Sequence, residues 1–179
     1  MELLSLARLA LAGALLGFAP GAAAQATEAA IKAAFLYKFA GYVEWPAAAS
    51  AASDSPLVIA TLGADDVATE LETAVGSRTV NGRRVTVRRL KEGESPQGVH
   101  LLFIGRREAN ARAALRTAHQ HGVLTVSETG LEQGAAINFV TADERVTFEV
   151  ALDAAERGGH KISSRMLAVA RRVVPKGAS

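Results

Sequence analysis

The chain of 179 residues contains no cysteine, which excludes disulfide bonds, catalytic thiols and thiolate ligands for metals. An excess of charge of one sign is also missing, because 20 Lys and Arg stand against 18 Asp and Glu. The formal net charge of +2 gives no general attraction for nucleic acid, so nucleic-acid binding is not expected.

No apolar run reaches the about 20 residues that a transmembrane helix needs. The run from Leu9 to Phe18 follows Arg8 and precedes the small residues Ala22-Ala23-Ala24. This arrangement predicts a secretory signal peptide over residues 1–24 that is cleaved on export, with an uncleaved anchor as the alternative. We therefore expect residues 25–179 to form a single α/β domain in a bacterial periplasm, without a membrane span.

Motifs for catalysis and for cofactors are missing as well. His119 and His121 are two residues apart and share no helical face, and an H-E-x-x-H motif is absent. Gly63 follows an apolar run without a glycine-rich phosphate loop, and Asp65-Asp66 would repel a phosphate. Ser127 stands outside a G-x-S-x-G elbow. We expect no enzyme activity, no catalytic residue, no metal and no cofactor.

Aromatic residues make up only 5% of the chain, and they are concentrated in residues 33–46. As a helix, this segment has an apolar arc of about 180°, wider than the ~100° of a surface helix. It is either a core helix covered by two layers or a helix with one face kept for a partner. Thr27 is the predicted N-cap, and Pro46 ends the helix near Glu44. One side of the helix carries Ile31, Phe35, Phe39, Tyr42 and Val43, and Lys32 and Lys38 must extend along this arc to reach solvent.

Continuous apolar runs closed by glycine alternate with helical stretches in the middle of the chain. This alternation predicts a mainly parallel central sheet with helices on both faces. The expected strands are 57–62, 84–90, 100–104 and 123–126, and the expected helices are 65–75 and 107–121. Four arginines between 83 and 89 form either an anion site or, as we expect, the solvated face of an edge strand.

The C-terminal third changes to an antiparallel hairpin, in which Ile137 and Phe139 share one strand face and Val146, Phe148 and Val150 another. A short helix is expected at 151–157. A last helix is expected from Ser163 or Ser164 to about Val174, with Arg165 and Arg172 one above the other on its outer side. These cations either stabilise the helix end or contact a partner.

Taken together and in chain order, a set of segments resembles the YfiR family of small periplasmic regulators. The segments are 33–46, 58–63, 80–90, 102–105, 124–127, 134–139, 145–150 and 162–173. They cover nearly the whole of the expected mature chain.

The resemblance implies a periplasmic α/β protein, often dimeric, that binds the periplasmic sensory domain of an inner-membrane diguanylate cyclase and holds it inactive. Cyclic di-GMP and biofilm formation would fall as a result. Relatives also accompany other membrane sensors, and the disulfides of some relatives have no counterpart here. We expect partner contacts at Glu149, Lys161, Ser164 and Arg165, with Tyr37 and Trp45 as secondary candidates.

An alternative function is a periplasmic small-ligand sensor that works with a membrane receptor, a sensor kinase or a transporter. The ligand would then bind beyond the carboxyl ends of the parallel strands. We expect such a crevice near Gly63, Gly105 and Ser127.

Overall fold

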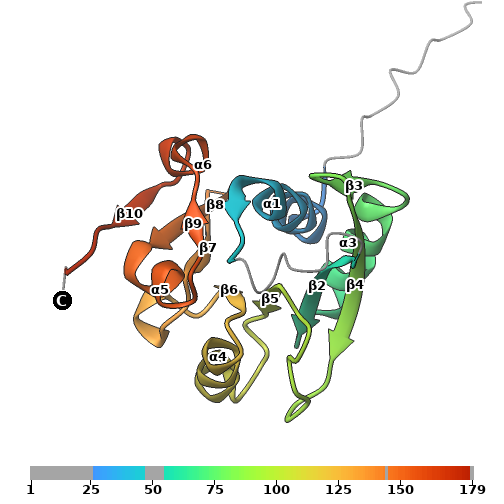
Figure 1. Cartoon of the computed structure of the whole chain (residues 1–179), viewed down its shortest axis with the longest axis horizontal. Coiled ribbons are helices and arrows are strands. Elements are labelled where there is room, and N and C mark those ends of the chain that lie inside the picture. Colours follow the sequence, from blue (N-terminus) through green and yellow to red (C-terminus); the bar gives the residue numbers. More distant parts are fainter. Residues whose placement is uncertain (1–25, 47–54, 144, 178–179) are drawn as a thin grey trace, which may run out of the picture.

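The computed structural model describes residues 26–46, 55–143 and 145–177 (Figure 1). The expected signal peptide over 1–24 and most of the expected loop after Pro46 lie outside these residues. The helices are α1 (Glu28–Tyr42), α3 (Asp65–Val75), α4 (Ala111–Gln120), α5 (Leu152–Arg157) and α6 (Ser164–Ala168), with a 3-10 turn η1 (Leu131–Gln133). The strands are β1 (Val43–Glu44), β2 (Leu57–Leu62), β3 (Thr79–Val80), β4 (Arg83–Leu90), β5 (Leu101–Ile104), β6 (Leu124–Ser127), β7 (Ile137–Ala142), β8 (Arg145–Ala151), β9 (Lys161–Ile162) and β10 (Arg172–Val174).

An eight-stranded sheet with the order β10-β8-β7-β6-β5-β2-β4-β3 is the scaffold. Its central strands, from β4 to β7, are parallel, and β7 and β8 form the expected antiparallel hairpin. β3 folds back on β4 through Asn81-Gly82, where φ is 50° and 80°. Asn and Gly tolerate this left-handed backbone better than other residues. The predicted fold class is confirmed.

Helix α1 lies inside the curl of the sheet, with β2 and β4 on one side of it and β7 and β8 on the other (Figure 1). Its Phe39 ring lies 4.8 Å from that of Phe148 and 5.8 Å from that of Phe139, between centroids. Helix α3 packs on the same face of the sheet beside α1. Most of the wide apolar arc of α1 is therefore core, which agrees with the first interpretation of that helix.

Helix α4 covers the opposite face of the sheet, where Leu115 and Ala118 pack with Leu102 and Ile104. Helices on both faces are thus confirmed. Within the described residues, no helix is long and apolar enough to cross a membrane.

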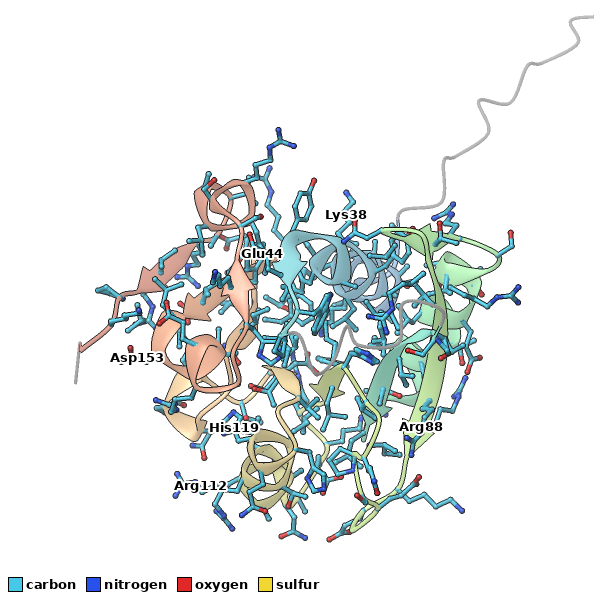
Figure 2. The ribbon with its side chains drawn as sticks, in the orientation of Figure 1. Lys38, Glu44, Arg88, Arg112, His119 and Asp153 are labelled. Atoms are coloured by element: carbon cyan, nitrogen blue, oxygen red, sulfur yellow. The ribbon has the colours of Figure 1, made fainter. Side chains whose placement is uncertain are left out.

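Helix α1 begins as expected, because the Thr27 hydroxyl accepts a hydrogen bond from the Ala30 amide at 3.1 Å. It ends at Tyr42, slightly earlier than expected, because Val43 is extended and pairs with Ile162 of β9. Tyr42, on the apolar side of the predicted helix, is 41% exposed, so the apolar arc is not covered at its carboxyl end. Lys38 is exposed and points away from the sheet (Figure 2).

The expected C-terminal helix to Val174 was also wrong. Helix α6 ends at Ala168, and the Arg171 amide then donates a hydrogen bond to the Phe148 carbonyl at 2.8 Å. The following residues form β10, parallel to β8. The β-branched Val173 and Val174 suit a strand, and a helix there would leave the outer edge of β8, opposite β7, unpaired. Arg165 and Arg172 therefore do not share a helix face.

The start of helix α4, on the other face of the sheet, differs from the prediction. The expected helix from 107 begins at Ala111, after turns at 106–107 and 109–110. The Glu108 carboxylate accepts a hydrogen bond from the Asn110 amide at 3.0 Å, which holds the chain in a turn before the first helical residue.

Candidate functional site

A hollow of about 710 Å³ opens where the end of α1, the β3–β4 turn and the start of α6 meet. We call it the C-terminal groove. Its lining residues are Gly41, Tyr42, Val43, Glu44, Trp45, Leu57, Val80, Asn81, Arg83, Ser163, Ser164 and Arg165.

Strands β1 and β9 hold one wall of the C-terminal groove in place. They pair antiparallel, and the Ser163 amide donates a hydrogen bond to the Tyr42 carbonyl at 2.9 Å. The exposed side chains of Glu44 and Lys161 lie 3.8 Å apart across this pair. We call β1, β9 and the Ser163–Tyr42 hydrogen bond the clasp. It is the only direct backbone ladder in the described part of the chain that joins the end of α1 to the start of α6.

Trp45 has a fixed position in the groove. Its indole Nε1 donates a hydrogen bond to the Ala40 carbonyl at 3.2 Å, and its ring meets those of His100 and His160 edge to face. Arg83 is held nearby, because its Nε donates to the Ser55 carbonyl at 3.0 Å. Both large side chains are therefore anchored by contacts within the chain.

Helix α6 forms the exposed rim of the groove. The Ser163 hydroxyl accepts from the Met166 amide at 3.4 Å, and the Met166 side chain is buried in the core. Arg165 is exposed and forms no ion pair with any residue that the structure describes. Val169, at the end of the helix, is 71% exposed. An apolar side chain and an unpaired cation on one short helix are features of a contact surface.

The structure brings together most, though not all, of the residues that the sequence predicted as contacts. Trp45, Ser164 and Arg165 line the C-terminal groove, and Lys161 belongs to the clasp. Tyr37 lies close by, since its hydroxyl donates to the Thr79 carbonyl beside the groove residue Val80 at 3.1 Å.

Glu149 lies elsewhere. It is on β8, where its carboxylate accepts two hydrogen bonds from the Arg172 guanidinium at 2.9 and 3.2 Å. Sequence reasoning also missed Tyr42, Arg83 and Val169. The position of Tyr42 at the end of the aromatic segment was a signal for it, whereas nothing local distinguishes Arg83 from the neighbouring arginines.

A second hollow, of about 230 Å³, lies at the carboxyl ends of β2 and β5 and is the crevice expected near Gly63. We call it the strand-end crevice. At its edge a Cβ on Gly105 would collide with the Gly63 carbonyl, so the two strand ends can meet only with glycine there. The lining residues are Glu28, Ala29, Lys32, Gly63, Ala64, Asp66, Val67, Arg106, Arg107 and Glu128.

The central charges of the strand-end crevice pair with one another. Lys32, only 4% exposed, contacts the carboxylates of both Glu28 and Glu128, and Arg106 donates to Glu128 at 3.2 Å. The hydrogen bond from Lys32 is the main cause that lowers the pKa of Glu28. Ser127 is buried and donates to the Asn138 side chain at 3.2 Å. This network ties α1 to the loops after β5 and β6.

No group of three or more His, Asp or Glu side chains that could hold a metal ion occurs in residues 26–46, 55–143 and 145–177. The profile of the YfiR/HmsC-like family matches residues 29–171. A comparison with curated proteins gave no match.

Proposed function

Because the chain belongs to the YfiR/HmsC-like family, we propose that it represses the periplasmic sensor domain of an inner-membrane diguanylate cyclase. The family is a regulatory, non-catalytic one of periplasmic proteins in cyclic di-GMP signalling. Repression would lower cyclic di-GMP in the cell and with it biofilm formation. In a variant of this proposal, the partner is another membrane sensor instead of the cyclase.

The contact surface in this proposal is the C-terminal groove with helix α6. The observation that carries it is the exposure of Tyr42 and Arg165 in the lining of a hollow whose inner side chains are already anchored, with Val169 exposed at the end of α6. Tyrosine and arginine are enriched among the residues that dominate binding energy. A matching partner segment has an apolar side chain for the groove and a carboxylate for Arg165.

Repression follows from a difference in affinity between two states of the sensor. The protein must bind the inactive conformation more tightly than the active one, because equal affinity would shift nothing. Moving the sensor from 1% to 99% inactive needs a difference of roughly 10⁴-fold. Trp45 holds the groove wall through its hydrogen bond to the Ala40 carbonyl, and Lys161 pairs with Glu44 across the clasp. Ser164 lines the groove as a contact residue.

To test the proposal, variants with one exposed arginine replaced are expressed in cells that lack the chromosomal gene. We expect Arg165→Glu to weaken binding at least about thirtyfold and to raise cyclic di-GMP toward the level of the deletion strain. Arg116→Glu is the matched control, since Arg116 is exposed on α4, on the opposite face of the sheet.

Three results would contradict the proposal. They are an unchanged cyclic di-GMP level after deletion, full repression by Arg165→Glu, and crosslinking from the groove that recovers no membrane sensor. Each is read against wild-type protein expressed at the same level.

We also propose a homodimer, as the family resemblance implies. Light scattering of the purified protein measures its mass directly, and a monomer at micromolar concentration would contradict this part.

A small-ligand sensor is the alternative function, with the strand-end crevice as its site. The mutual pairing of Lys32, Arg106, Glu28 and Glu128 leaves little reason for a ligand to bind there. A thermal-shift screen with metabolites tests this alternative, and a stabilising compound whose effect is lost in Arg107→Ala would favour it.

A further inference from the structure

His160 is a buried histidine between α5 and β9, only 1% exposed. Its Nδ1 lies 3.3 Å from the Ala155 carbonyl oxygen. A carbonyl can only accept, so Nδ1 carries the proton of the neutral ring. Nε2 is then the bare nitrogen, and it is buried without a hydrogen-bond partner in the part of the chain that the structure describes.

The surroundings of His160 oppose a positive charge. The Trp45 ring packs edge to face on it, with centroids 5.5 Å apart. The charged or titratable groups that face it are His100, just before β5, and His119, on α4. Arg83 lies beyond His100, with Nη2 3.0 Å from the Nε2 of that ring. On its own elements, Lys161 of β9 pairs with Glu44, and Glu156 of α5 pairs with Lys176.

No carboxylate among the described residues lies within ion-pair distance of His160. Burial is the main cause that lowers the pKa of His160, and His100 and His119 lower it further. An added proton would therefore sit on a buried nitrogen that has neither an acceptor nor a counter-ion.

We propose that His160 is an acid-sensitive lock on the clasp, and that protonation of its Nε2 opens the β1–β9 ladder and the wall of the C-terminal groove. The connection is covalent and short. Lys161 and Ile162 of β9 follow His160 directly, and Trp45 follows the Val43–Glu44 strand on the other side. An imidazolium gains water only if Trp45 and His160 separate, and this separation pulls the two strands apart.

The direction of the pH effect follows from the lowered pKa. The neutral ring stabilises the closed clasp fully above 6.5, the ordinary pKa of histidine. This stabilisation is lost as the pH falls from there through the lower pKa of the folded protein.

The test measures amide hydrogen exchange in the isolated full chain at about pH 7.5 and about pH 5. Protection factors, corrected for the intrinsic rate at each pH, are compared for the ladder residues Val43, Glu44 and Ile162 and for Ser163. We expect them to fall several-fold at the lower pH in the wild type, because the closed clasp holds the His160 ring neutral and the opened clasp does not.

His160→Asn is the decisive variant. The Asn amide nitrogen can replace Nδ1–H as the donor to Ala155, but the side chain cannot take up a proton. We expect its protection factors to be equal at the two pH values. His121→Asn is the control, because His121 is exposed on the far end of α4, and it should respond like the wild type.

The proposal would be overturned if the protection factors of the wild type did not fall at the lower pH. It would also be overturned if those of His160→Asn fell in the same way. If His160→Asn fails to fold, a second measurement on the wild type tests the proposal. Trp45 is the only tryptophan, so its emission reports the contact with His160. The change in Trp45 emission with falling pH must then have the same midpoint pH as the shift of the His160 ring signal in NMR. Separate midpoints would overturn the proposal. Release of a membrane partner by acid rests on the proposed function, whereas these measurements on the isolated chain do not.

Discussion

The C-terminal groove and the strand-end crevice are both hollows with charged walls, but they differ in how those charges are used. In the crevice, Lys32 and Arg106 are bound by Glu28 and Glu128. In the groove, Arg165 projects from a short helix without an ion pair to any described residue. Paired buried charges fix one structure, whereas an exposed cation beside apolar side chains is free to recognise another molecule. The comparison therefore separates a structural tie from the proposed contact surface.

The largest effect on stability should come from the crevice. Lys32→Met leaves the carboxylate of Glu128, whose side chain is only 6% exposed, with Arg106 as its remaining partner. We expect a loss of about 3 kcal/mol in the free energy of unfolding, measured with urea. Lys38→Met on the exposed side of the same helix should change it by less than about 0.5 kcal/mol. Equal effects of the two variants would show that the ion pairs of Lys32 do not stabilise the fold.

A smaller effect is expected from the anchor of the groove rim. Met166 is 2% exposed and fixes α6 to the core. Met166→Ala should lower the free energy of unfolding by about 2 kcal/mol and should also weaken repression, because α6 loses its fixed position. Val169→Ser should weaken repression without changing stability, since Val169 is exposed. A Val169→Ser protein that loses as much stability as Met166→Ala would show that α6 is a core element.

The smallest expected effect is the change with pH in the stability that the ion pairs of Glu28 contribute. The pKa of Glu28 is lowered mainly by Lys32, so its ion pairs stabilise the folded state above the ordinary value of 4.5. This stabilisation is lost as the pH falls through the lower pKa of the folded protein. The Glu28 side chain is 46% exposed, which limits the effect to about 1 kcal/mol or less.

Urea unfolding at several pH values between about 5 and about 3 measures this loss, and Glu28→Gln should reduce its slope. Glu70→Gln serves as the control, because Glu70 forms no ion pair with any residue of the described ranges. Identical slopes for wild type and Glu28→Gln would contradict the assignment.

The sequence predicted the central sheet well, because buried parallel strands are continuous apolar runs whose pattern does not depend on distant residues. Leu57–Leu62 and Leu101–Ile104 are such runs. The end of the chain was harder to predict. Val173 and Val174 fit an apolar helix face or a strand equally well, and only the open edge of β8 decides between them.

The candidate sites depend on contacts between distant residues, and local patterns do not contain these. Lys32 and Glu128 meet across the fold, and nothing near either residue indicates the other. The groove forms because β1 pairs with β9, and two strands of two residues each leave no periodic signal. Glu149 was assigned to the same surface only because it precedes α6 in the sequence. The position of β10 directs it to Arg172 instead.

The place of α1 at the centre of the sheet has a consequence for the order of folding. Phe35 and Phe39, near the start of the described chain, pack on Phe139 and Phe148 near its end. The first helix therefore has nothing to cover its aromatic side chains until β7 and β8 have been made and have paired. Such non-local contacts slow folding and keep apolar surface exposed for longer. While it is being synthesised, this chain depends on being kept from aggregating until its last third arrives.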